Sequence, residues 1–192
     1  MYTEVKLEDQ KNKGKMHPHK FVLWVAIGSI IMMFAGLTSA YIVKSGTASW
    51  QGVRTPSIFW YSTSVLLISS ITMQSALRAF KQREMTWFRG LLFFTFVLGI
   101  TFVVLQWIGF KYLWSHGVHF EGSGAGQFLY IIFGLHALHV LGGIITLLVL
   151  VIQHNFGKSI RYNATPIEVM TTYWHFVDIL WIYLLIFFIW IG

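Results

Sequence analysis

Residues 170–192 read MTTYWHFVDILWIYLLIFFIWIG, a run long and apolar enough to cross a membrane as one helix. Polar groups interrupt this run or lead into it: Glu168, His175 and Asp178. A charged Asp near the centre of a membrane helix costs about 2.5–3.5 kcal/mol, so such a group normally faces protein or water. His175 and Asp178 are three residues apart and Glu168 lies about two turns earlier, so the three share one helix face. This stripe is the main candidate for function.

The composition indicates a membrane protein. Of 192 residues, 56% are hydrophobic and 11% are charged, whereas soluble domains average about 25% charged residues. The absence of cysteine excludes disulfides, cysteine-bound iron–sulfur clusters and thiol catalysis. Lipid cannot satisfy an open backbone, so long continuous apolar runs favour helices. We therefore expect an all-α bundle with five transmembrane helices, at residues 20–43, 57–77, 90–110, 127–153 and 170–192.

The positions of lysine and arginine predict the orientation of the chain. Eleven of them fall in the N-terminal tail through Lys20 and in the second and fourth connections, against three on the opposite side. Because positively charged connections stay in the cytoplasm, we expect a cytoplasmic N-terminus and an external C-terminus. Residues 1–19 are expected to form a flexible cytoplasmic tail, and residues 20–192 a single domain, since the connections are too short for a second core. The net charge of +7 then reflects topology and not a nucleic-acid partner.

The fourth segment carries a second polar pair, His136 and His139, again on one helix face. At about 1.5 Å per residue, His139 lies roughly 18 Å from one end of its segment and Asp178 roughly 12 Å from the other end of the last segment. These levels nearly meet in a core of about 30 Å. The spacing therefore allows a contact between His139 and Asp178 on antiparallel neighbours.

Three interpretations compete for these polar groups, and the first two are functional. Imidazole binds iron, copper and zinc, so the two histidines with His175 and Asp178 could form a metal or haem site; a second cluster, His116, His119 and Glu121, lies in an external loop. Intramembrane acids and histidines also serve in proton or substrate paths. However, the first three segments carry no ionisable group in mid-span, and Gln74 and Gln106 lie toward their ends.

The third interpretation is structural, and the residues favour it. Interhelical polar contacts contribute about 0.6–2 kcal/mol each and can fix the register of a bundle. Small residues let membrane helices approach closely, which predicts helix contacts at several glycines: Gly28, Gly36, Gly134, Gly142 and Gly143.

The motifs resemble subunit III of the haem–copper oxidases, in its short five-helix bacterial form. In that family an acid is followed after four residues by Tyr-Trp-His-Phe-Val-Asp, and here Glu168 precedes residues 173–178 with the same spacing. The stretch GLHALHVLGG at 134–143 is similar to the family's Gly-Phe-His-Gly-Leu-His-Val and following glycines. In the third segment, Gly99, Phe102 and Gln106 resemble the family's spacing. The family's two further acids are missing, at Ile30 and Gly109, so no role of those carboxylates carries over.

The resemblance implies a non-catalytic subunit of a proton-translocating cytochrome c oxidase in the bacterial inner membrane. It implies haem and copper in subunit I, allows copper in subunit II, and implies none in this chain. It further implies that the chain stabilises subunit I, holds phospholipid and supports proton uptake, with subunits I and II, small subunits or a respiratory supercomplex as partners. Alternatives are subunit III of a quinol oxidase, a small transporter and a haem-binding membrane protein. The candidate residues form a structural polar network with lipid-binding potential: Gln106, His136, His139, Glu168, Tyr173, Trp174, His175 and Asp178.

Overall fold

The computed structural model describes residues 18–46, 57–116, 124–156 and 164–191. These residues form five helices: α2 (Pro18–Ser45), α3 (Ile58–Lys81), α4 (Met85–Ser115), α5 (Gly124–Phe156) and α6 (Thr165–Ile191). No strand occurs in these ranges. The predicted all-α class is confirmed, and each expected segment falls within or close to one of the helices.

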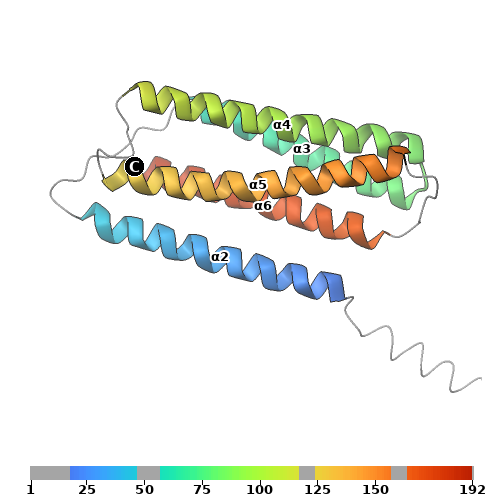
Figure 1. Ribbon diagram of the computed structural model, residues 1–192, viewed down its shortest axis with the longest axis horizontal. Coiled ribbons are helices and arrows are strands. Elements are labelled where there is room, and N and C mark those ends of the chain that lie inside the picture. The colour runs from blue at the N-terminus through green and yellow to red at the C-terminus, as the bar shows by residue number, and fades with distance from the viewer. Residues whose placement is uncertain (1–17, 47–56, 117–123, 157–163, 192) are drawn as a thin grey trace, which may run out of the picture.

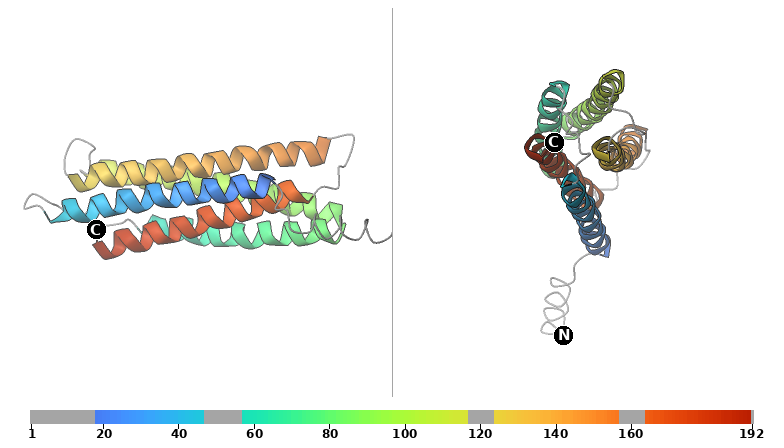
Figure 2. Two further views of the ribbon diagram at one scale, coloured as in Figure 1. Left: turned by 90° about the horizontal axis from the view of Figure 1, so that it is seen from below. Right: turned by 90° about the vertical axis from the view of Figure 1, so that its left-hand side faces the viewer.

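The helices run lengthwise beside one another (Figure 1). Helices α3, α4, α5 and α6 form a closed ring in which each contacts the next, and α2 packs outside the ring against α5 and α6. The end-on view in Figure 2 shows α2 apart from the α3–α4 pair, with α6 between them. Helices α5 and α6 each contact three others, and α6 is the one that joins α2 and α5 to α3.

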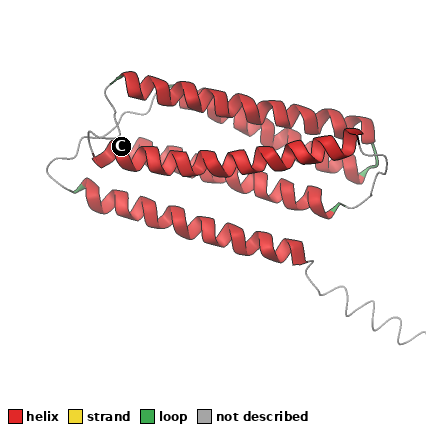
Figure 3. Cartoon of the chain, viewed as in Figure 1, coloured by secondary structure: helices red, strands yellow, loops and turns green. Residues whose placement is uncertain are grey.

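Four of the five helices are long and apolar enough to cross a membrane: α2, α4, α5 and α6. Helix α3 has 24 residues and at about 1.5 Å per residue is long enough to span. Its hydroxyl residues lower its apolarity: Ser62, Thr63, Ser64, Ser69, Ser70, Thr72 and Ser75. The crossing of α3 stays a prediction, supported by its packing against α4, which Figure 1 labels; Figure 3 shows the same helices from the same side.

A tight turn joins α3 to α4. Arg83 adopts a left-handed backbone conformation with φ of 63°, which is uncommon for a residue other than glycine. The backbone N–H of Arg83 donates to the Phe80 carbonyl, and the N–H of Glu84 donates to the Ala79 carbonyl. These bonds satisfy the last carbonyls of α3 and reverse the chain within three residues.

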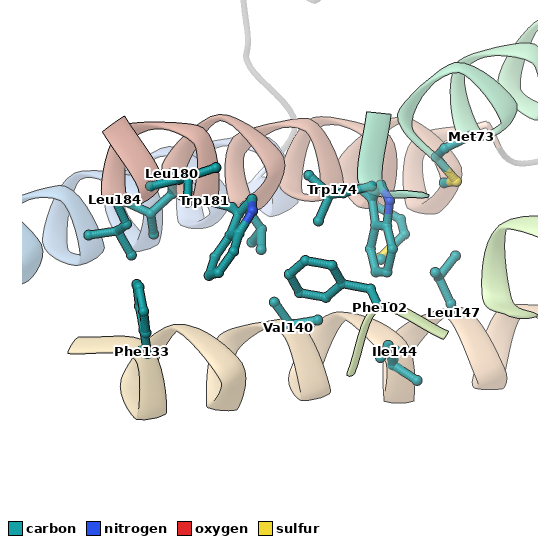
Figure 4. Packing of buried hydrophobic residues seen from close by; sticks show 14 of the residues in the cluster. Met73, Phe102, Phe133, Val140, Ile144, Leu147, Trp174, Leu180, Trp181 and Leu184 are labelled. Atoms are coloured by element: carbon teal, nitrogen blue, oxygen red, sulfur yellow. The ribbon is translucent and has the colours of Figure 1, made fainter. Parts of the chain in front are cut away.

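Aromatic side chains fill the centre of the ring. The Trp181 indole is 1% exposed, and it lies 5.3 Å from the ring centroids of both Phe102 and Phe133. Figure 4 shows these three side chains gathered between α5 and α6. Edge-to-face and tilted aromatic pairs contribute about 0.5–1.5 kcal/mol beyond their burial, so this cluster fixes how α4, α5 and α6 meet.

Among the described residues, a close approach is found at one of the five glycines predicted to be helix contacts. A Cβ at Gly143 would meet Trp174 at 3.1 Å, whereas a Cβ at Gly28, Gly36, Gly134 or Gly142 would meet nothing within 4 Å. The close approaches on α4 are instead at Gly99, against Trp174, and at Gly109, against Phe59. The prediction failed at four positions because small size permits a close approach but does not select which face of a helix is packed.

Candidate functional site

Helix α6 is joined to α3 by two tryptophan hydrogen bonds. The Trp174 indole N–H donates to the Ser69 hydroxyl over 3.1 Å, and the Trp181 indole N–H donates to the Thr63 hydroxyl over 3.0 Å. The two tryptophans are seven residues apart and their acceptors six, which matches two helical turns on each antiparallel helix. Each buried indole N–H is thereby satisfied within the membrane region.

The stripe on α6 leads into a chain of hydrogen bonds with α3. The His175 ring contacts Gln74 Oε1 through Nε2 at 3.1 Å and the Ser70 hydroxyl through Nδ1 at 2.6 Å. The Ser70 side chain also lies beside the Asp178 carboxyl group. Asp178 is 4% exposed, and its Oδ2 has no hydrogen-bond partner among the described residues. Polar groups thus connect Gln74 to a buried carboxyl group with one oxygen left over.

Glu168 joins three helices at one end of the bundle. Its Oε2 pairs with Lys20 Nζ on α2 and its Oε1 with Lys81 Nζ on α3, both over 2.8 Å. All three side chains are partly exposed, so each pair contributes at most about 1 kcal/mol. The Lys81 pair and the contacts of His175 place the stripe toward α3, and the Lys20 pair also joins its Glu168 end to α2.

A groove of about 350 Å³ lies beside Glu168, between α2, α3 and α6. Polar groups line its rim: Lys20, Gln74, Lys81, Glu168, Thr172 and His175. Its remaining walls include Leu23, Trp24, Leu77 and Val169. A second groove of about 500 Å³ lies between α2, α5 and α6 and shares Leu23 and Val169 with the first. Charged and apolar surfaces therefore meet beside α2, where the two grooves adjoin.

The predicted contact between His139 and Asp178 is not found. His139 Nδ1 hydrogen-bonds the Leu135 carbonyl of its own helix over 2.7 Å, and Asp178 faces α3. The link between α5 and α6 is instead the Tyr173 hydroxyl, which donates to the His139 carbonyl over 2.9 Å. Depth in the membrane allowed the original contact, but depth does not determine which side of a helix a residue occupies.

His136 and Gln106 lie in a different part of the core. His136 is 1% exposed, and neither ring nitrogen has a hydrogen-bond partner among the described residues. Its ring lies tilted against Trp181 with 5.3 Å between centroids. Gln106 donates through Nε2 to the Ser62 hydroxyl over 3.1 Å, while its buried Oε1 has no partner in the described part of the chain. These two residues are not brought together with Asp178 and His175.

The described residues contain no group of three or more His, Asp or Glu side chains close enough to hold a metal ion. In the predicted loop cluster, His119 and Glu121 lie outside the described ranges. His116 stacks on Tyr112, with 4.0 Å between ring centroids. The prediction that this chain carries no cofactor of its own stays a prediction.

The sequence does not identify the hydroxyl and amide groups of α3 as the hydrogen-bond partners of the stripe. The acceptors Thr63 and Ser69 are six residues apart, close to the seven that separate Trp174 and Trp181. Similar spacings of about two turns on the two segments are therefore the sequence signal for a shared interface. The sequence also does not predict the ion pairs of Lys20 and Lys81, because it indicates only on which side of the membrane these lysines lie.

The sequence matches the family described as cytochrome c oxidase subunit III over residues 3–192. This chain belongs to the cytochrome c oxidase subunit III family. Similar proteins named probable cytochrome c oxidase subunit 3 occur in Mycobacterium tuberculosis and Mycobacterium bovis, each 34% identical over 176 residues, covering 89% of this chain and 86% of theirs. A protein from Staphylococcus epidermidis named probable quinol oxidase subunit 3 is 25% identical over 183 residues, covering 93% of this chain and 90% of the relative.

Membership of the subunit III family confirms the predicted resemblance. As a subunit III, the chain is an integral membrane protein that associates with other oxidase subunits. Within this family member, the residues of the last-helix motif lie at the α3–α6 and α5–α6 contacts and beside the groove at Glu168.

Proposed function

We propose that this chain is a non-catalytic subunit III of a proton-translocating haem–copper oxidase in a bacterial inner membrane. In this role it stabilises the oxygen-reducing subunit I, binds phospholipid and supports proton uptake. The carrying observation is that Trp174, His175 and Asp178 direct their polar atoms to α3 rather than into a shared ligand set. Haem and copper then belong to subunit I, with copper also allowed in subunit II.

Stabilisation of a partner subunit requires a bundle that keeps its own shape. The tryptophan bonds to Ser69 and Thr63 and the aromatic cluster at Trp181 provide that rigidity. Large apolar side chains remain exposed on the outer faces, for example Trp107 at 72% and Trp190 at 84%. In a membrane complex such faces contact lipid or neighbouring subunits, including small subunits or a supercomplex partner.

The proposed role in proton uptake rests on a series of neighbouring polar side chains: Gln74, His175, Ser70 and Asp178. Gln74 Oε1 can only accept, so His175 donates to it through Nε2, while the imidazole and the serine hydroxyl can each both donate and accept and so extend the series. It begins at the polar groove, which contains Gln74 and His175, and ends at the buried carboxyl group of Asp178. Intramembrane acids and histidines in such chains commonly serve as relay groups. We propose that these neighbouring polar side chains store or pass a proton near the surface of subunit I.

The two adjoining grooves support the proposal of phospholipid binding. Lys20 and Lys81 provide two positive charges against the single Glu168, which suits an anionic head group. The apolar walls shared by the two grooves suit acyl chains. The head group would lie at the end of the bundle that the lysine and arginine distribution assigns to the cytoplasm.

We propose cytochrome c as the electron donor of the complex. The relatives named for cytochrome c oxidase share 34% identity with this chain, and the relative named for quinol oxidase shares 25%. The alternative is subunit III of a quinol oxidase, because both kinds of relative cover most of the chain. Assay of the purified complex with reduced cytochrome c and with a quinol distinguishes the two.

The variant Asp178→Asn tests the proposed role within the assembled oxidase. Asparagine keeps the shape of the side chain but cannot exchange a proton, so the complex should assemble with unchanged haem spectra and lose activity sooner during turnover. Thr101→Val is the matched control, because Thr101 is exposed and bonds only its own helix. An unchanged turnover lifetime for Asp178→Asn would reject the proton role. If the wild-type chain fails to copurify with haem- and copper-containing subunits, the oxidase assignment itself is wrong, and transport assays and a haem spectrum of the isolated chain then test the other classes.

A further inference from the structure

A cavity of about 270 Å³ lies between α4 and α5, away from the grooves beside α2. Its walls are mainly aromatic and aliphatic, and they include Phe102, Phe110, Phe133 and Trp181. Two further wall residues, Trp107 and Leu141, are 72% and 45% exposed on the outside of the bundle. The cavity is therefore reached from the lipid side of the protein.

Two buried polar side chains lie in the wall of this cavity, and their unpaired hydrogen-bonding atoms lie just beneath its apolar surface. Gln106 is 5% exposed and His136 is 1% exposed. Among the described residues, no partner exists for Gln106 Oε1 or for either ring nitrogen of His136. Gln106 lies nine residues from the end of α4 and His136 twelve from the start of α5, so both are roughly 14–18 Å from the same end of the bundle. Leaving such groups unsatisfied is costly, because each buried unpaired group costs about 1–3 kcal/mol.

The chemistry of these atoms defines what would satisfy them. Gln106 Oε1 accepts only, and a neutral imidazole offers one N–H donor and one acceptor nitrogen. An occupant must therefore both donate and accept, as a hydroxyl group does. An ether or a quinone carbonyl only accepts and would leave Gln106 Oε1 unpaired. The aromatic walls add a preference for an aromatic ring, since ring pairs gain about 0.5–1.5 kcal/mol beyond their burial.

We propose that this cavity is a binding site for a membrane-dissolved phenol or hydroquinone, whose ring packs among the aromatic walls and whose hydroxyl pairs with Gln106 and His136 when these side chains turn toward it. The volume approaches the lower range of small-molecule pockets, about 300 Å³, and fits a ring-sized head. It far exceeds the roughly 30 Å³ that one water occupies. The exposed edge at Trp107 and Leu141 lets an attached alkyl chain extend into the bilayer.

Photocrosslinking tests the proposal in the purified oxidase complex and in the full chain alone. The probe is an alkylphenol that carries a diazirine on its alkyl chain. We expect labelling of α4 and α5 near the cavity, and competition by unlabelled alkylphenol about tenfold stronger than by its methyl ether, since the ether cannot donate. An aliphatic alcohol of equal length should also compete less well.

Matched variants separate the site from general partitioning. His136→Phe keeps a ring but removes both nitrogens and should weaken competition by the phenol about tenfold. The control His154→Phe lies on the same helix, where His154 packs edge-on against Phe88 and away from the cavity. Ala137→Phe places a ring in the cavity and should abolish labelling, whereas Leu138→Phe, on the exposed face, should not. If His136→Phe does not fold, the comparison of Ala137→Phe with Leu138→Phe tests whether the cavity binds the phenol.

Three outcomes would overturn the proposal. Equal competition by the phenol and its methyl ether would show an unselective apolar cavity. Labelling of the isolated chain but not of the complex would show that a neighbouring subunit fills the space. Absence of cavity labelling in both samples would show that the buried groups are satisfied by water.

Discussion

The indole N–H of Trp174 donates to the Ser69 hydroxyl over 3.1 Å, and the same indole ring fills the space beside two glycines of other helices. A Cβ at Gly99 on α4 would lie 3.0 Å from the ring, and one at Gly143 on α5 would lie 3.1 Å from it. One side chain of α6 therefore contacts α3, α4 and α5 at once. Its polar edge fixes the register with α3, and its faces set the distance to α4 and α5.

Replacement of this indole should destabilise the whole ring of helices. In Trp174→Phe, the hydrogen bond to Ser69 and part of the ring volume are lost, so we expect a decrease of about 1–3 kcal/mol in the free energy of unfolding. Denaturant titration in detergent measures the change. Trp190→Phe is the control, since Trp190 is 84% exposed, and it should change stability by less than about 0.5 kcal/mol. Equal effects of both variants would contradict the central role of Trp174.

The buried glycines of α4 should tolerate no side chain. A Cβ at Gly109 would lie 2.7 Å from Phe59 Cε1, and Phe59 is fully buried against Phe133 and Trp181. Because the ring cannot move freely, Gly109→Ala should cost about 1–3 kcal/mol through overpacking. Gly134→Ala has open space around it and should be neutral or stabilising by up to about 1 kcal/mol, since alanine favours a helix. Thermal unfolding of the two variants provides the comparison, and a neutral Gly109→Ala would refute the close packing.

The groove at Glu168 should lose lipid when one of its lysines is removed. Lys81→Gln breaks one of the two ion pairs of Glu168 and removes positive charge. Stability should fall by less than about 1 kcal/mol, because the pair is partly exposed. Anionic phospholipid that copurifies with the complex should decrease, as measured by mass spectrometry of the extracted lipids. Lys111→Gln, near the opposite end of the bundle on α4, should leave lipid content unchanged; a similar loss there would indicate that charge alone matters.

The predicted orientation can be measured directly because the chain contains no cysteine. A single cysteine at Gln82, in the turn between α3 and α4, should react with a membrane-impermeant maleimide only in inverted vesicles. A cysteine at Ser115, at the other end of α4, should react in intact cells. The expectation follows from the excess of lysine and arginine on the Gln82 side. The reverse labelling pattern would place the N-terminus outside and would overturn the topology.

The sequence predicted the helices well because their apolar runs are long and the membrane admits few alternatives. It also identified the stripe of Glu168, His175 and Asp178 as one face of α6. It could not identify the helix opposite that face, since a depth estimate contains no rotational information. His139 was therefore assigned to Asp178, although Ser70 on α3 is the actual neighbour. The α3 partners were missed individually because serine and threonine in a membrane helix commonly bond their own backbone, as Ser64 does.

The turn at Arg83 and the hydroxyl content of α3 have a consequence for how the protein enters its membrane. Helix α3 is the least apolar of the five; several of its hydroxyl groups bond its own backbone, and α4 adds side-chain partners at Thr72 and Ser62. Since three residues separate the two helices, α4 leaves the ribosome directly after α3 and can shield it. The pair is thus a single unit of biogenesis: a chain that stops at Lys81 should integrate α3 poorly in a translocation assay, and one that continues to Ser115 should integrate both helices together.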